Sequence, residues 1–185
     1  MQKLRAPVGR RELLLGGAAS LAATALPAPA IARGFGDFRM LSLTNWRTEE
    51  KVTCVYWADG AYIPEAMNAF NYILRDWRQE VVATIDPSVI DILARTQAKL
   101  NTDEPFEIVS GFRTASTNNT LRRRGRGVAK KSYHVRAMAV DIAMKTRSVR
   151  QIATAGEAVN RGGVGRYSRS EFVHLDSGPL RTWGR

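Results

Sequence analysis

Two histidines and one aspartate are the residues of this chain whose types best suit metal chemistry. His134 and Asp141 lie seven residues apart, across a segment predicted to turn and then enter a strand, and His174 lies within the last predicted strand. Two imidazoles and one carboxylate are a common ligand set for catalytic zinc, which leaves a fourth position for water. Solitary histidines and aspartates are more often surface residues or hydrogen-bonded core residues. Residue type and spacing alone therefore leave both interpretations open.

Composition limits the other kinds of chemistry. The chain has 185 residues, of which 44% are hydrophobic and 24% are charged, as is typical of a globular protein with one domain. It contains one cysteine, Cys54, which excludes a disulfide within the chain and a cysteine-rich metal site. We expect Cys54 to be a small core residue.

The chain is strongly basic. Its 28 Lys and Arg residues against 17 Asp and Glu residues give a formal net charge of +11, which indicates an acidic partner such as nucleic acid or an anionic envelope polymer. Six of the cations lie between Arg122 and Lys131. Such a run can bind phosphates or acidic wall polymers, but it is more often a solvated loop. It also lacks the interleaved aromatic residues of a protein that binds single-stranded nucleic acid.

Residues 1–32 are predicted to be an export signal. A basic start precedes a weakly apolar run and a small-residue cleavage site after Ala32. The run is too short and too rich in Gly, Ala and Ser for a membrane-spanning helix, which needs about 20 strongly apolar residues. Arg10 and Arg11 resemble a twin-arginine signal, with an ordinary Sec signal as the alternative. We therefore expect a mature domain of residues 33–185 in the periplasm or cell envelope, without a membrane span and without a nucleic-acid partner.

The elements that must position the candidate ligands follow from apolar periodicity and turn residues. Pro64 and Asp86-Pro87 are typical helix starts, and apolar residues follow the first of them at helical spacing as far as Trp77. The tetrapeptide Gly162-Gly163-Val164-Gly165 is predicted to be a tight turn, because no Lys-Ser/Thr follows it to make a phosphate-binding loop. The sum is a single α+β domain. We predict strands at 39–45, 51–57, 106–110, 138–144 and 171–176, and helices at 64–77, 86–100, 116–124 and 148–160.

Three segments match a known pattern. They are Ser-Tyr-His-Val-Arg-Ala-Met-Ala-Val-Asp at residues 132–141, His-Leu-Asp at 174–176 and Ser-Gly-Phe-Arg at 110–113. They resemble the zinc peptidase family of D-Ala-D-Ala carboxypeptidases and murein endopeptidases, whose fold is shared with the hedgehog signalling domain. Residues 127–134, 162–165 and 172–179 are most similar to the twin-arginine-exported, murein endopeptidase K-like branch of that family.

The resemblance implies a fold, a cofactor and a substrate. The fold is a small antiparallel sheet with flanking helices, and Zn²⁺ is bound by His134, Asp141 and His174. Peptidoglycan peptides are then the substrate, and Arg113 and Ser132 bind them. A guanidinium suits this role because it holds a carboxylate or carbonyl in a fixed geometry, although a surface salt bridge is the alternative for Arg113.

Several properties stay open at this point. The bond cleaved is D,D or L,D, and the enzyme is an endopeptidase or a carboxypeptidase. A non-catalytic relative that binds zinc or peptidoglycan, and a basic protein that binds polyanions, are the alternatives to an enzyme. Three residues depart from the family pattern: Arg166 replaces an aromatic residue, Ser168 replaces a proline, and Ala137 replaces a glycine. A positive φ at Ala137 would strain the backbone.

The general base has two candidates. Glu171 lies three residues before His174, where carboxypeptidases of the family place a catalytic glutamate, and Asp176 lies two residues after it. Alternate strand residues share a face, so Phe172, His174 and Asp176 project together while Glu171 starts on the other side. Strand parity favours Asp176, either as the base or as a residue that orients a metal ligand. The resemblance favours Glu171.

Overall fold

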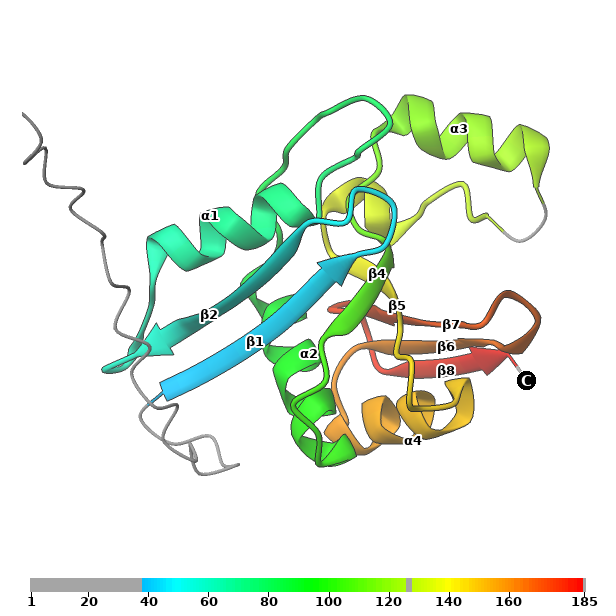
Figure 1. Ribbon diagram of the computed structural model, residues 1–185. Helices are drawn as coiled ribbons and strands as arrows, with labels where there is room; N and C mark the ends of the chain where they lie inside the picture. Colours follow the sequence, from blue (N-terminus) through cyan, green and yellow to red (C-terminus); the bar gives the residue numbers. More distant parts are fainter. Residues whose placement is uncertain (1–37, 126–127, 185) are drawn as a thin grey trace, which may run out of the picture. The chain divides into compact units, whose positions relative to one another are not determined.

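The computed structural model describes residues 38–125 and 128–184, so the predicted export signal and Arg126 lie outside the described residues. Within these described residues, eight strands form one sheet in the order β3-β2-β1-β4-β5-β7-β6-β8 (Figure 1). The sheet is mostly antiparallel, with parallel pairing between β1 and β4 and between β6 and β8. The predicted α+β class is confirmed. The strands are β1 (Phe38–Asn45), β2 (Lys51–Ala58), β3 (Ala61–Tyr62), β4 (Phe106–Ser110), β5 (Ala139–Ala143), β6 (Gly163–Tyr167), β7 (Phe172–Asp176) and β8 (Arg181–Gly184).

The helices begin and end at residues that suit helix termini. Asp86 caps α2 by accepting a hydrogen bond from the backbone N of Ser88 at 2.9 Å, and Ser148 forms a capping box with Gln151 at the start of α4. Asn101 and Asn160 end these two helices in the left-handed conformation. The helices are α1 (Pro64–Ile73), α2 (Pro87–Leu100), α3 (Ala115–Arg124) and α4 (Val149–Val159), with short 3-10 helices η1 (Tyr133–Arg136) and η2 (Ser168–Ser170).

The core lies between the sheet and the helices that pack on it. Phe70 of α1 makes an edge-to-face contact with Tyr56 of β2, and α2 and α4 pack against each other and against the sheet. Cys54 is half-buried and packs against this core. Among the described residues, no helix is both long enough and apolar enough to span a membrane. Helix α3 stands away from the sheet (Figure 1).

Two of the predicted elements are wrong in their extent or type. Helix α1 ends at Ile73 and does not reach Trp77, because tertiary hydrogen bonds take its last carbonyl groups: Asn45 Nδ2 donates to the oxygen of Ile73 and the Phe112 backbone N donates to that of Leu74. The predicted turn at 162–165 is in fact largely strand β6, and only Gly162 in it has a positive φ, of 66°. Strands β3, β6 and β8 were not predicted.

Candidate metal centre

Neighbouring strands bring Asp141 and His174 together. Asp141 on β5 and His174 on β7 are directly paired in the antiparallel ladder, so both side chains project from the same face of the sheet. Their strand neighbours Val140 and Leu175 project from the opposite face, where both are fully buried in the hydrophobic core. The alternation of side chains along each strand therefore separates the candidate ligands from the core.

His134 reaches the same place from the 3-10 helix η1. The Ser132 hydroxyl caps this helix by accepting a hydrogen bond from the backbone N of His134 at 3.3 Å. Ala137 ends the helix with a φ of 55°, and the chain then enters β5. The position where the family pattern has a glycine thus has a positive φ here, and Ala137 carries the strain expected of a residue with a Cβ.

The three candidate ligand atoms form a compact triangle. His134 Nε2 lies 3.1 Å from Asp141 Oδ1 and 3.1 Å from His174 Nδ1, and His174 Nδ1 lies 2.8 Å from Asp141 Oδ1. All three residues are buried. Two ligand atoms that are each about 2.0–2.1 Å from a tetrahedral zinc ion lie roughly 3.3 Å apart. The triangle therefore has nearly the size of one face of such a site.

The surrounding hydrogen bonds leave an electron pair on each atom of the triangle. His134 Nδ1 lies 2.7 Å from the carbonyl oxygen of Gly111, which can only accept, so the ring proton lies on Nδ1 and Nε2 faces the triangle unprotonated. His174 Nε2 lies 2.9 Å from Asp176 Oδ2 and donates to it, which leaves Nδ1 as the ligand atom. Three electron-pair donors that face one another need a cation between them, so these residues fit a bound metal ion.

The charge states of the cluster agree with this geometry. Burial lowers the pKa of His134 and keeps that ring neutral. Burial alone would also lower the pKa of His174, but its hydrogen bonds to Asp141 and Asp176 raise it to about 9. Burial alone would raise the pKa of Asp141, but the two histidines hold it well below its usual range. A proton on His174 and a metal ion are thus alternative cations for the same cluster.

Asp176 is fully buried and saturated with hydrogen bonds. Its Oδ1 accepts from the backbone N of Gly163 at 3.2 Å, from the backbone N of Gly178 at 2.8 Å and from Arg181 Nη1 at 3.0 Å. Its Oδ2 accepts from His174 Nε2 and, at 2.7 Å, from Arg181 Nη2. Burial alone would raise the pKa of Asp176, but hydrogen bonds from His174 and Arg181 lower it to about 2. This arrangement suits a carboxylate that orients His174 better than one that takes a proton from water.

Glu171 lies outside the cluster. It follows η2 with a φ of 55°, directly before β7, and its side chain is exposed. In the part of the chain that the structure describes, no hydrogen bond or ion pair joins Glu171 to His134, Asp141 or His174. The structure thus brings Asp176, and not Glu171, into contact with a candidate ligand.

Arg113 contacts the cluster from the end of β4. Its Nη2 lies 2.5 Å from Asp141 Oδ2 and 3.3 Å from His134 Nε2, and its Nε donates to Ser110 Oγ at 2.8 Å. Because Arg113 holds Oδ2, Oδ1 is the oxygen of Asp141 that faces the two imidazoles. Arg113 and Ser132 therefore both position ligand-bearing residues in this structure, and substrate contact by either of them stays a prediction.

Strands β6 and β8 add residues that the sequence analysis missed. A Cβ on Gly165 would lie 2.5 Å from the Trp183 ring, and one on Gly163 would lie 2.6 Å from the Arg181 guanidinium. Because these glycines have no side chains, the side chains of Arg181 and Trp183 can lie across β6. The Trp183 ring centroid is thereby 5.3 Å from that of His174. The period-two spacing of these two glycines, and of Arg181 and Trp183, was the signal available in the sequence.

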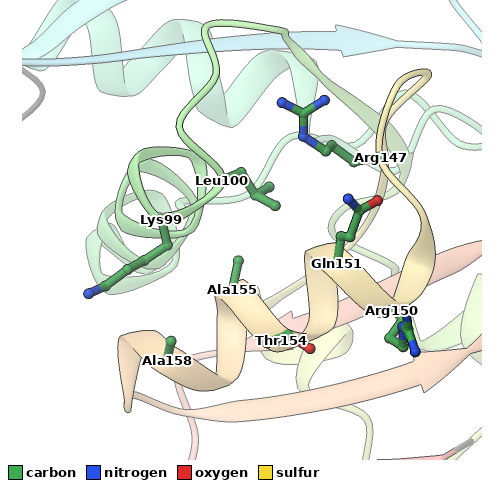
Figure 2. Close-up of a pocket in the computed structure, with 8 residues that line it drawn as sticks. All are labelled: Lys99, Leu100, Arg147, Arg150, Gln151, Thr154, Ala155 and Ala158. Atoms are coloured by element: carbon green, nitrogen blue, oxygen red, sulfur yellow. The ribbon is translucent and has the colours of Figure 1, made fainter.

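A separate cavity of about 400 Å³ lies between α2 and α4 (Figure 2). It contains none of the candidate ligands or their hydrogen-bond partners, so it does not belong to the metal centre. It is lined by Lys99, Leu100, Arg147, Arg150, Gln151, Thr154, Ala155 and Ala158.

Two buried residues on one face of a mixed sheet and a third from η1, each oriented by a further hydrogen bond, make this a protein with a candidate mononuclear metal centre. The family described as peptidoglycan L,D-endopeptidase MepK matches residues 34–183, and the chain belongs to this family.

Individual relatives are similar over most of their length. The peptidoglycan L,D-endopeptidase MepK of Escherichia coli (strain K12) is 41% identical over 175 residues, which are 94% of this chain and 96% of that protein. The probable peptidoglycan L,D-endopeptidase MepK of Haemophilus influenzae is 34% identical over 146 residues, 78% of each chain. Among solved structures, the L-Ala D-Glu endopeptidase ChiX of Serratia marcescens has a TM-score of 0.34 and 19% identity, covering 41% of this chain and 62% of that one. That likeness is too low to bear on the fold.

Proposed function

We propose that this chain is a zinc-dependent peptidoglycan L,D-endopeptidase that hydrolyses peptide cross-links of the cell wall. The observation that carries the proposal is the convergence of His134 Nε2, His174 Nδ1 and Asp141 Oδ1 in a member of the MepK family. The names of the relatives support an L,D bond and an endopeptidase, which the sequence left open. A bound zinc ion would polarise the scissile carbonyl and activate a water molecule for attack on it.

The residues around the ligands keep them in the geometry that binding requires. The carbonyl of Gly111 and the carboxylate of Asp176 each hold one imidazole by its second nitrogen, which fixes the tautomer and the ring orientation. We assign Asp176 to this positioning role. Arg113 uses Nε and Nη2 for Ser110 and Asp141, and its Nη1 is the donor proposed to hold a substrate carboxylate or carbonyl oxygen.

Purified muropeptides test the activity directly. The protein is incubated with dimers joined by an L,D bond, dimers joined by a D,D bond and monomeric stem peptides, with and without a chelator, and the products are identified by mass. We expect chelator-sensitive conversion of the L,D dimer to monomers. Release of a terminal residue only would make the chain a carboxypeptidase, and binding without cleavage would make it a non-catalytic relative.

Metal analysis tests the site independently of activity. We expect about one zinc per chain after dialysis, and a loss of zinc in His134→Ala and His174→Ala. The control is Arg150→Gln, which removes an exposed cation at the cavity between α2 and α4, where no candidate ligand lies. Full zinc occupancy in both histidine variants would show that the metal lies elsewhere.

Arg113→Lys separates binding of substrate from folding. Lysine keeps the charge but loses the planar, two-pronged geometry. We therefore expect turnover of the cross-linked peptide to fall while the free energy of unfolding changes little. Equal turnover by wild type and variant would assign Arg113 to structure alone.

We also propose that residues 1–32 are a twin-arginine signal and that the mature protein acts in the periplasm or cell envelope. A reporter fused after Ala32 tests this with Arg10→Lys and Arg11→Lys together, which preserve every positive charge. Arg5→Lys is the matched control. We expect export to stop only in the paired variant, and undiminished export would indicate the Sec route.

A further inference from the structure

The segment between Arg113 and Ser132 leaves the metal centre and returns to it. The backbone N of Arg113 donates to the carbonyl of His134 at 3.2 Å, and the ring of His134 donates to the carbonyl of Gly111. These two hydrogen bonds join the beginning and the end of the segment at the candidate site. Side chains on this segment are therefore held close to the candidate metal centre.

The base of the segment is well anchored. The backbone N and the hydroxyl of Thr114, which caps α3, donate to Asp76 Oδ2 at 2.9 Å and 3.0 Å. Asn118 Nδ2 donates to the carbonyl of Ala129 at 3.1 Å, which ties the returning chain to α3. A helix of ten residues is about 15 Å long, so the last turn of α3 lies well away from this base (Figure 1).

Five exposed cations lie on the outer part of this segment. We call them the basic cluster: Arg122, Arg123, Arg124, Lys130 and Lys131. None of the five forms an ion pair with another described residue. Two of the five donate hydrogen bonds to neutral groups: Arg122 to the Asn119 side chain and Arg123 to the Thr120 hydroxyl. The sequence contains no Asp or Glu from residue 108 to residue 140, while eight Lys and Arg occur there.

Folding does not account for so much positive charge. The helix dipole favours a cation in the last turn of α3, but Lys130 and Lys131 lie outside the helix. An acidic residue one turn away stabilises a cation on a helix surface, and α3 contains no acidic residue. Neighbouring like charges repel each other, so the basic cluster opposes folding slightly and leaves its charge available to a ligand.

We propose that the basic cluster binds free carboxylates of peptidoglycan stem peptides beside the cleaved cross-link, and so holds the enzyme on the insoluble polymer. This inference rests on the proposed function. The position of the cluster favours the polymer, because the segment that carries it begins and ends at the cleavage site. An amphipathic helix inserted into a membrane interface is disfavoured, because such insertion uses aromatic and large apolar anchors and residues 114–131 contain no aromatic residue.

The test compares two triple variants that lose the same charge. One is Arg122→Gln, Arg123→Gln and Arg124→Gln, which keeps helix-forming residues in α3. The matched control is Lys99→Gln, Arg147→Gln and Arg150→Gln, around the cavity between α2 and α4 (Figure 2). Co-sedimentation of each purified full-length protein with intact sacculi, in the presence of a chelator, measures binding at several salt concentrations. Cleavage rates on sacculi and on a soluble L,D-linked dimer are measured in parallel.

We expect the α3 variant to bind sacculi on the order of tenfold more weakly than the control variant does, because one exposed ion pair contributes a factor of roughly 1.4 to 5. Its binding should also depend less steeply on salt. The ratio of its cleavage rate on sacculi to that on the soluble dimer should fall by a similar factor. If the α3 variant does not fold, Lys130→Gln with Lys131→Gln tests the same surface outside the helix.

Other outcomes overturn the inference. Equal losses in both triple variants would show that only net charge matters. Retained binding to sacculi, together with lost binding to vesicles that contain phosphatidylglycerol, would assign the cluster to a membrane. Failure of the proposed function is distinguishable, because sedimentation needs no catalysis. If no protein cleaves any muropeptide while only the cluster variant loses sacculus binding, the chain is a polymer-binding protein. The inference that the basic cluster binds the polymer is then retained.

Discussion

Asp176→Asn tests whether this residue orients His174 or acts as a base. The substitution keeps the size of the side chain and removes its charge. The carboxylate accepts five hydrogen bonds, and His174 and Arg181 supply three of them. An amide has one accepting oxygen, and its NH₂ group only donates. In either orientation of the amide, at least two of the present donors would therefore face another donor.

The two roles predict losses of different kinds. Removing a group that orients a metal ligand lowers metal affinity by about 10- to 100-fold, and unpaired buried donors reduce the free energy of unfolding by roughly 1–3 kcal/mol. We expect both effects for Asp176→Asn, and we expect saturating zinc to restore its cleavage rate to within about tenfold of wild type. Loss of a general base would instead lower the rate by about 10²-fold or more at any zinc concentration.

The assay measures zinc content and the cleavage rate on the same samples, across a zinc titration. Glu171→Gln is measured alongside, and we expect it to keep nearly the wild-type rate because Glu171 contacts no candidate ligand. An Asp176→Asn protein that holds zinc with wild-type affinity yet loses 10²-fold in rate would refute our assignment. The same loss in Glu171→Gln, with normal zinc content, would make Glu171 the base, as the family resemblance favours.

Three further substitutions each test one structural feature. Gly165→Ala places a methyl group against Trp183, so cleavage should slow and thermal unfolding should show a loss of about 1–3 kcal/mol. Burial alone would raise the pKa of Asp76, but hydrogen bonds from Thr117 and Thr114 lower it. Such a carboxylate stabilises the fold above about pH 4, and this contribution disappears as the pH falls through its folded pKa. Asp76→Asn should therefore destabilise the protein in urea at pH 7 and differ less from wild type at pH 3. Ala137→Gly should change the free energy of unfolding by less than about 1 kcal/mol, because relief of roughly 1–2 kcal/mol is offset by chain entropy and a lost buried methyl.

Two of the candidate ligands lie in strands that the sequence predicts, whereas His134 lies in the 3-10 helix η1, and the assignment of all three as ligands came from the family resemblance. Asp141 and His174 both occur in runs whose alternation predicts a half-buried strand, and alternation also predicts that His174 and Asp176 share a face. Both strands and the shared face are present in the structure. Which strands are neighbours could not be predicted in this way, because pairing between β5 and β7 depends on contacts between residues far apart in the chain.

The strands beside the site were missed for a different reason. Gly163 and Gly165 have no side chains with which to show alternation, and glycine is normally unfavourable in a strand. The glycines are explained only by Arg181 and Trp183, which occupy the space above them. The period-two spacing of the two glycines therefore indicates a strand only once the residues above them, which belong to β8, are known.

The premature end of α1 has the same kind of cause and bears directly on the site. Local periodicity continues to Trp77, but the carbonyl of Leu74 accepts a hydrogen bond from the backbone N of Phe112. A Cβ on Gly111 would overlap that same carbonyl, so the close approach requires glycine. The N–H of Phe112 and the carbonyl of Gly111 belong to the same peptide group, so this contact also fixes the carbonyl that orients the ring of His134. Helical propensity at residues 74–77 is therefore overridden by packing that positions a metal ligand, and the three ligands alone would not specify the site without the segment from Ser110 to Arg113.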